Sequence, residues 1–186
     1  MKPFRPYGEF QRKLGQPRSA LATIVSGTVT KIAPPPNVGN DNHQIYELLG
    51  FDELQNVVLT SPLAIDLPGG SIPAGTRVKS HYVFFDPSAS STIGGTAIFD
   101  DDILGIMTST NTLQTSDFLG APGTNYLSPS MRGLESNDSA VITDARTVTV
   151  SFFASSPGDY IRVITAPEPT TLSMLALAGF ILRKRR

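Results

Sequence analysis

Short stretches that alternate apolar and polar side chains, separated by turns rich in Gly and Pro, run through residues 20–166. This alternation is typical of β-strands, whose successive side chains point to opposite faces. The clearest stretch is 76–86, where one face would carry Val78, Ser80, Tyr82 and Phe84 and the other Lys79, His81, Val83 and Phe85. The chain also holds 16 Gly and 15 Pro, a content that suits a turn-rich β fold better than a helical one.

Ten segments have this strand-like character, and only residues 110–119 suggest a short helix within this part of the chain. The segments are 21–32, 45–51, 57–60, 63–67, 76–86, 96–100, 103–109, 139–143, 146–154 and 159–165. Many short strands with turns between them and almost no helix are typical of two packed β-sheets. We therefore predict an all-β fold in which residues 20–166 form one antiparallel β-sandwich, jelly-roll-like in arrangement.

The charged residues are distributed unevenly along the chain. Residues 19–166 hold 14 of the 16 acidic residues but only 6 of the 15 lysines and arginines, a net charge of 6 − 14 = −8. Nucleic-acid binding needs a basic surface, so an acidic domain argues against a nucleic-acid partner. The chain has no cysteine, which excludes a disulfide framework and cysteine-ligated metals.

Three consecutive carboxylates, Asp100, Asp101 and Asp102, are the candidate metal ligands, because Ca²⁺ prefers several oxygen ligands. Adjacent strand residues point to opposite faces, so the three carboxylates would not all converge and a solvated acidic turn is the favoured interpretation. We expect no cofactor, with Ca²⁺ as the one alternative. His81 is expected to be a structural histidine, since the chain has only two histidines. Tyr126, in a long loop, is the tyrosine expected to be exposed.

The last twenty residues have a different organisation. Pro167, Glu168 and Pro169 favour an extended linker, because proline fixes φ and disfavours helix before it. Residues 172–182 are apolar on all sides and predict a short hydrophobic helix that could enter a membrane. Its large apolar residues are Leu172, Met174, Leu175, Leu177, Phe180, Ile181 and Leu182. The chain then ends on a basic cluster, Arg183, Lys184, Arg185 and Arg186, that suits the cytoplasmic side of a membrane.

This order of motif, hydrophobic helix and basic end resembles the PEP-CTERM sorting signal of bacterial exported proteins. The resemblance covers residues 167–186, and residues 20–166 more weakly resemble the globular part of uncharacterised PEP-CTERM proteins. It implies that Pro167, Glu168 and Pro169 are a recognition motif for exosortase, a membrane enzyme thought to cut there. It further implies that residues 172–182 are a transient membrane anchor and that the basic cluster is its stop signal.

Residues 1–19 are basic and are expected to lack a stable fold. A secretory signal peptide, with an apolar core after its basic start, is not visible in them. Because the resemblance implies export, we expect either a misplaced start codon or a truncated gene model.

Together these features predict a non-enzymatic protein that is membrane-anchored in transit and then resides in the cell envelope or outside the cell. An exosortase-type enzyme and the membrane are the expected partners, with exopolysaccharide as a further one. Two alternatives remain open. One is a carbohydrate-binding module, with or without Ca²⁺, although the chain has no tryptophan to stack on sugars. The other, less favoured, is a small hydrolase that uses a pair of carboxylates.

Overall fold

The computed structural model describes residues 23–167, and most of its regular structure is β-strand. The fourteen strands are β1 (Ile24–Gly27), β2 (Thr30–Lys31), β3 (Asn37–Val38), β4 (Ile45–Asp52), β5 (Val57–Val58), β6 (Leu63–Ala64), β7 (Ser71–Ile72), β8 (Arg77–Asp86), β9 (Ser91–Phe99), β10 (Ile103–Met107), β11 (Asn125–Tyr126), β12 (Ser139–Asp144), β13 (Thr147–Ala154) and β14 (Asp159–Thr165). Two short helices, α1 (Thr110–Thr115) and the 3₁₀ helix η2 (Asp117–Leu119), follow β10. The all-β prediction is confirmed.

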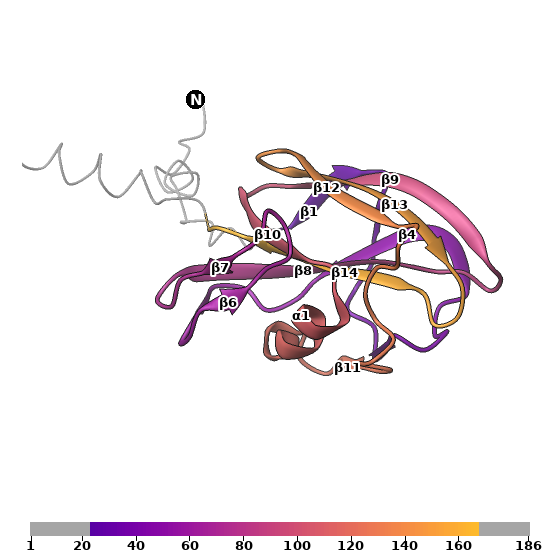
Figure 1. The fold of residues 1–186 in the computed structure, drawn as a ribbon, viewed down its shortest axis with the longest axis horizontal. Helices are drawn as coiled ribbons and strands as arrows, with labels where there is room; N and C mark the ends of the chain where they lie inside the picture. Colours follow the sequence, from indigo (N-terminus) through magenta and orange to yellow (C-terminus); the bar gives the residue numbers. More distant parts are fainter. Residues whose placement is uncertain (1–22, 168–186) are drawn as a thin grey trace, which may run out of the picture.

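Two sheets form the centre of the molecule. One has the strand order β1-β9-β13-β12 and the other β10-β14-β8-β4-β2, with β5 paired to the start of β8. The two sheets lie as separate layers in Figure 1. After β8 the chain passes to β9 in the first sheet, back to β10 in the second, then to β12 and β13 and finally to β14. Apart from β12 and β13, the strands that are neighbours in these two sheets are therefore not consecutive in the chain.

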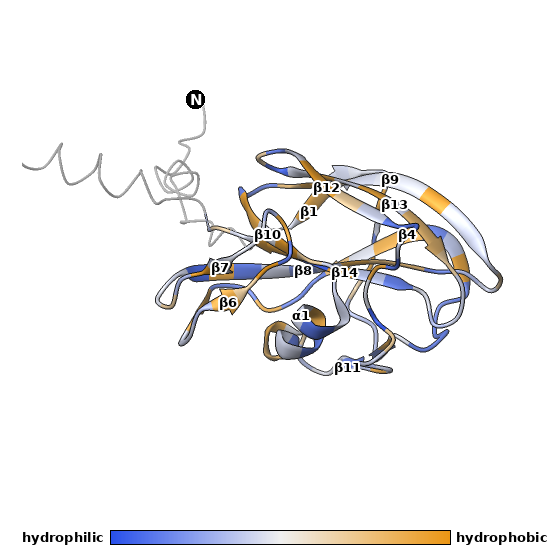
Figure 2. Cartoon of the chain, viewed as in Figure 1, coloured by the Kyte–Doolittle hydropathy of each residue, from blue (hydrophilic) through white to orange (hydrophobic). Residues whose placement is uncertain are grey.

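The space between the two sheets is filled by an apolar core. Strand β13 supplies Val148, Val150, Phe152 and Ala154, and its alternate residues face outward, as the sequence predicts. Strands β8 and β14 contribute Val83, Phe85, Ile161 and Val163 from the opposite sheet. Figure 2 shows the strong hydrophobic character of β10 and β13. Burial of apolar surface between these layers is the main stabilising term of such a fold.

A third layer covers the other face of the larger sheet. It consists of α1, η2, the β6–β7 hairpin and the β3–β11 pair, and Figure 1 shows α1 and β11 on that side. A second core lies beneath it, formed largely by Phe51, Tyr82, Phe84, Tyr160, Leu113 and Leu119. Consequently nearly all of β8 and all of β14 are buried on both faces.

The short strands β3, β7 and β11 were not predicted, and the strand pattern differs from the sequence prediction in three larger respects. Residues 21–32 are not one strand: the chain breaks at Gly27 and enters a different sheet at β2. Strand β9 begins at Ser91, five residues before the predicted start, because its whole length pairs with β13. The pairs β2–β4 and β3–β11 are parallel, whereas a purely antiparallel arrangement was predicted.

The predicted helix at 110–119 is also divided, into α1 and η2, at Ser116. Among residues 23–167 no helix has the length and hydrophobicity needed to cross a membrane. The predicted basic segment 1–19 lies outside the described residues. The sorting signal 167–186 does so too, apart from Pro167, and with it the hydrophobic helix at 172–182 and the basic cluster.

Candidate functional site

Both ends of the described chain are bound to one turn, which consists of Asp100, Asp101 and Asp102 and joins β9 to β10. We call it the acidic turn. The Thr23 backbone nitrogen donates to Asp100 Oδ1 at 2.8 Å, and the Asp100 nitrogen donates to the Thr23 oxygen at 3.3 Å. At the other end of the chain, the Ala166 nitrogen donates to the Asp102 backbone oxygen at 2.8 Å. The first and last described residues therefore lie at the same end of the domain.

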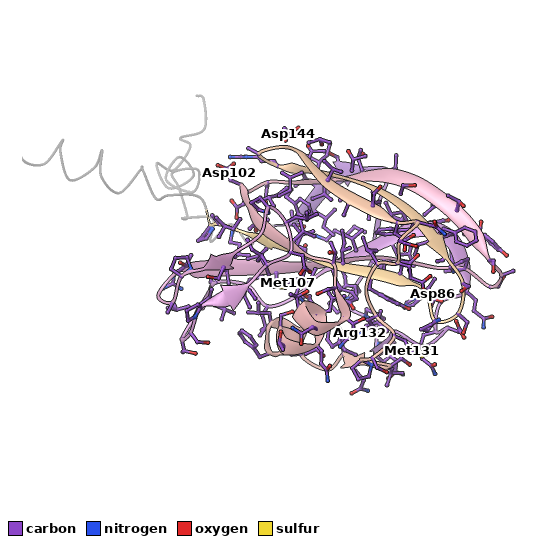
Figure 3. The ribbon with its side chains drawn as sticks, viewed as in Figure 1. Asp86, Asp102, Met107, Met131, Arg132 and Asp144 are labelled. Carbon is purple, nitrogen blue, oxygen red and sulfur yellow. The ribbon has the colours of Figure 1, made fainter. Side chains whose placement is uncertain are left out.

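The three carboxylates of the acidic turn have different partners. Asp101 Oδ2 lies 2.7 Å from the Lys79 ammonium, and both side chains are only 2 % exposed. Asp102 Oδ1 accepts from Arg146 Nε at 2.9 Å on the surface, while Asp100 binds the Thr23 backbone. Figure 3 places Asp102 at the margin of the molecule. Among the described residues, no three Asp, Glu or His side chains are grouped so that they could hold a metal ion. The structure therefore does not bring Asp100, Asp101 and Asp102 together as the calcium hypothesis requires.

A buried histidine lies at the same end of the domain. The ring nitrogens of His81 contact Asp52 Oδ1 at 2.8 Å and Thr165 Oγ1 at 3.1 Å, and the side chain is fully buried. Asp52 also forms an ion pair with Lys31 and accepts a hydrogen bond from the Thr23 hydroxyl. These contacts agree with the expected structural role of His81.

Burial disfavours the charged form of Asp52, but the hydrogen bonds from His81, Lys31 and Thr23 outweigh it and hold the pKa of this carboxyl well below its usual value. Asp52 is therefore ionised at neutral pH and ties together β1, β2, β4 and β8. These contacts hold Thr23 and Ile24, the first described residues, against the larger sheet.

The C-terminal exit is equally well defined. Thr165 is the last residue of β14 and is fully buried, Ala166 binds the acidic turn, and Pro167 follows directly. Pro167 itself is half-buried. No unpaired linker separates the sheet from the first proline of the predicted sorting motif, while Glu168 and Pro169 lie outside the described residues.

A second charged cluster, which the sequence analysis missed, lies beneath the third layer. The fully buried guanidinium of Arg162 donates to both carboxylate oxygens of Glu53, at 2.7 and 2.8 Å. It also donates to Ser116 Oγ at 2.6 Å and to the Leu113 carbonyl at 3.0 Å. Asp117 accepts from Arg162 at 3.3 Å. This contact links β14 to α1 and η2.

Arg132 completes this cluster. Its two terminal nitrogens donate to the two Asp117 oxygens at 2.9 and 2.7 Å, a bidentate arrangement. Glu53 in turn accepts from the hydroxyls of Ser80 and Tyr126. The charges are thus mutually compensated and the carboxylates are occupied. We interpret the cluster of Glu53, Asp117, Arg132 and Arg162 as a structural device that holds the third layer on the sheet, not as a reactive centre.

The aromatic residues are also placed differently from the prediction. Tyr126 is not exposed: it is half-buried, its hydroxyl is bonded to Glu53, and its ring lies 5.2 Å from the Arg162 guanidinium carbon. Among residues 23–167, the aromatic side chains with the largest exposure are Tyr46, Phe118 and Phe153. Phe153 borders a hollow of the surface.

No protein-family model, curated protein or solved structure matches this chain.

Proposed function

We propose that this chain is an exported bacterial protein that is sorted, and cut, at a C-terminal signal formed by residues 167–186. The single observation that carries the proposal is the order of Pro167-Glu168-Pro169, the apolar run 172–182 and the basic cluster Arg183–Arg186. Apolar residues followed at once by four cations suit a membrane anchor that is stopped at the cytoplasmic face. An exosortase-type membrane enzyme is the proposed partner.

The end of the domain supports this proposal. Because Ala166 is hydrogen-bonded to the acidic turn and Pro167 follows it immediately, the motif begins where the described fold ends. A cut in or after the motif would remove the anchor without removing any strand of the described residues. The acyl group formed by the cut would pass to water, releasing the domain, or to an amine of the cell envelope, attaching it.

For the domain itself we propose a structural or binding role in the envelope or the extracellular matrix, with exopolysaccharide as a candidate neighbour. We also infer that the two packed sheets are a β-sandwich of jelly-roll-like arrangement. The repeated passage of the chain from one sheet to the other between β8 and β14 supports this inference. The buried contacts of Glu53 and His81 support a non-enzymatic role, because both side chains are engaged in holding the fold.

The test is a double substitution, Glu168→Ala with Pro169→Ala, in the full chain carried behind a secretory signal sequence. The host is a bacterium with an exosortase-type enzyme. Intact mass spectrometry of the membrane and extracellular fractions measures the outcome. The unchanged chain should lose the residues after the motif, whereas the double variant should stay in the membrane at full length.

A matched control replaces two residues of the Pro34-Pro35-Pro36 loop, Pro34→Ala and Pro35→Ala, in the same chain. This control alters prolines far from the tail in sequence and should be processed normally. If the double variant is processed like the control, the sorting proposal is wrong. Loss of processing in a host without the enzyme would in turn identify the enzyme as the partner.

A further inference from the structure

A hollow of about 230 Å³ lies on the surface where the β13–β14 connection meets the loop after β11. Its walls include the apolar side chains of Met131, Phe153 and Pro157, the carboxylates of Glu135 and Asp159, and three serines. Strand β14 runs from Asp159 at the hollow to Thr165 at the acidic turn, so the hollow lies at the opposite end of this strand from the tail. Figure 3 accordingly shows Met131 and Asp102 far apart.

Among the described residues, Asp159 and Asp86 are buried acidic residues with a carboxylate oxygen that lacks a hydrogen-bond partner, but Asp86 accepts from the His43 nitrogen through its other oxygen. Asp159 is only 5 % exposed, yet its Oδ2 atom has no hydrogen-bond partner among residues 23–167. No ion pair with a described residue compensates its charge. A buried carboxylate without a partner is energetically unfavourable. A ligand with a positively charged hydrogen-bond donor would pair with this carboxylate and remove that penalty.

Two further carboxylates, of Asp138 and Glu135, lie near Asp159, and they differ in whether they could bind a ligand. Asp138 is occupied by hydrogen bonds, since its oxygens accept from the backbone nitrogens of Phe153 and Glu135, both at 2.7 Å. The side chain of Glu135 accepts no hydrogen bond from the described residues and lines the hollow. Burial, together with the negative charges of Asp138 and Glu135, raises the pKa of Asp159 to about 7.

The chemistry of the walls favours an organic cation over a metal ion. Ca²⁺ takes six to eight oxygen ligands, and no group of three acidic or histidine side chains in the described part of the chain is arranged to hold a metal. By contrast, Met131 and Phe153 expose 59 % and 46 % of their surface beside the carboxylates. An ammonium group attached to a carbon body can pair with the carboxylates, lie against the Phe153 ring and cover these apolar side chains.

We propose that this hollow binds a primary ammonium group on a small organic body, with Asp159 and Glu135 as its anionic partners and with Met131 and Phe153 as the apolar wall. The volume lies just below the usual range of ligand pockets, about 300–1,000 Å³, so the ligand has about the size of one amino sugar or of an aliphatic amine. The proposal does not depend on the sorting signal and would hold for a chain that is never cut.

The test is a titration of the full-length chain followed by amide NMR. Pentylamine at pH 8 should cause saturable shifts at Glu135, Phe153 and Asp159, whereas the uncharged isostere pentanol should not. Glucosamine and N-acetylglucosamine at pH 7 form a second pair, in which only glucosamine carries the ammonium. Binding of pentylamine alone would assign the site to aliphatic amines, and stronger binding of glucosamine would assign it to amino sugars.

The variant Asp159→Asn keeps the shape of the side chain and removes its charge. It should raise the dissociation constant for pentylamine by about tenfold or more, the scale of a lost charge-assisted hydrogen bond. The variant Glu47→Gln removes an exposed carboxylate of β4 that does not line the hollow and should leave binding unchanged. Phe153→Ala, at a partly exposed position, should also weaken binding and provides a second variant if Asp159→Asn does not fold.

Binding should depend on pH in a defined direction. As the pH falls from 8 to 6, Asp159 takes up a proton and loses the charge that attracts the ligand, so pentylamine should bind more weakly. In Asp159→Asn this dependence should largely disappear. The proposal is overturned if pentanol binds as well as pentylamine, if Asp159→Asn binds as tightly as the unchanged chain, or if Ca²⁺ displaces the amine at equal concentration.

Discussion

Arg162 lies in the middle of β14 with its guanidinium inside the protein, where every nitrogen of the group donates a hydrogen bond. Withdrawing a charge from water is unfavourable unless it is paired and hydrogen-bonded, and Glu53 and Asp117 supply the pairing. Arg162 also lies 5.2 Å from the Tyr82 ring centroid, which adds an aromatic contact to the cation. The cluster is thus sensitive to the loss of any one member.

We expect Glu53→Gln to lower the free energy of unfolding by about 3–5 kcal/mol, because it leaves the Arg162 charge buried with its main partner removed. Urea unfolding followed by circular dichroism measures this change. Asp102→Asn is the control: its ion pair with Arg146 is on the surface, with the Asp102 side chain 63 % exposed, so the loss should stay below about 1 kcal/mol. Equal losses in the two variants would contradict the structural role of the cluster.

One signal for this cluster was present in the sequence. Arg162 interrupts the apolar run of Tyr160, Ile161, Val163 and Ile164, and a cation in a strand buried on both faces requires a partner. The identity of that partner could not be predicted, because Glu53 is 109 residues away along the chain. The same limit applies to Asp159, whose environment depends on the loop after β11 and the β13–β14 connection, which meet only in the folded protein.

At the scale of elements, the break at Gly27 divides the predicted first strand into β1, which joins one sheet, and β2, which joins the other. Its φ of +109° is a backbone conformation that residues with a side chain rarely adopt. This conformation lets the chain turn from β1 on one sheet to β2 on the other. A Cβ at this position would lie 2.2 Å from the Thr96 backbone oxygen. The β-branched sequence of residues 21–32 predicts strand but does not show that the strand changes sheets.

The strands whose alternation was predicted correctly are β8 and β13, since each has two faces with distinct environments. The early part of β9 was missed because Gly94 and Gly95 weaken the strand pattern. Cross-strand pairing with β13 nevertheless extends β9 over them. Pairing with β13 therefore determines where β9 begins, because the local sequence preference for a strand is weak there.

We expect Gly27→Ala to destabilise the protein more than Gly70→Ala. Both glycines have positive φ, but the space around Gly70 is open, so alanine there meets backbone strain alone. At Gly27 the clash with Thr96 adds about 1–3 kcal/mol, the usual penalty of overpacking. Thermal unfolding of the two variants measures the difference, and similar melting temperatures would show that the contact with β9 is unimportant.

At the scale of the whole molecule, the domain closes on itself at the acidic turn. Thr23 and Ala166 are both hydrogen-bonded there, and the larger sheet is covered on both faces by other layers. The all-β class followed from composition and alternation alone. The third layer did not: the sequence predicted a helix at 110–119 and a strand at 63–67, but it did not show that they cover the far face of the larger sheet, and β3, β7 and β11 have only two residues each.

Truncation after Pro167 should leave the free energy of unfolding within about 1 kcal/mol of that of the full chain, since no described strand is removed. Truncation after Ile161 removes Arg162 and the second half of β14, and this shorter chain should not fold. Circular dichroism melting curves distinguish the two. A large loss of stability in the longer form would mean that residues 168–186 contribute to the fold.

The position of β14 also has a mechanical consequence. This strand lies between β8 and β10 and is antiparallel to both, and its last residue leads directly to Pro167. When the domain is held at its opposite end, near the β13–β14 connection, a pull on the tail acts along the strand and across two ladders of hydrogen bonds that lie roughly perpendicular to it. Under such shear the bonds of both ladders must fail together and cannot open one after another. A domain that is attached through this strand is therefore suited to bearing load, because the force must break both ladders before the strand leaves the sheet.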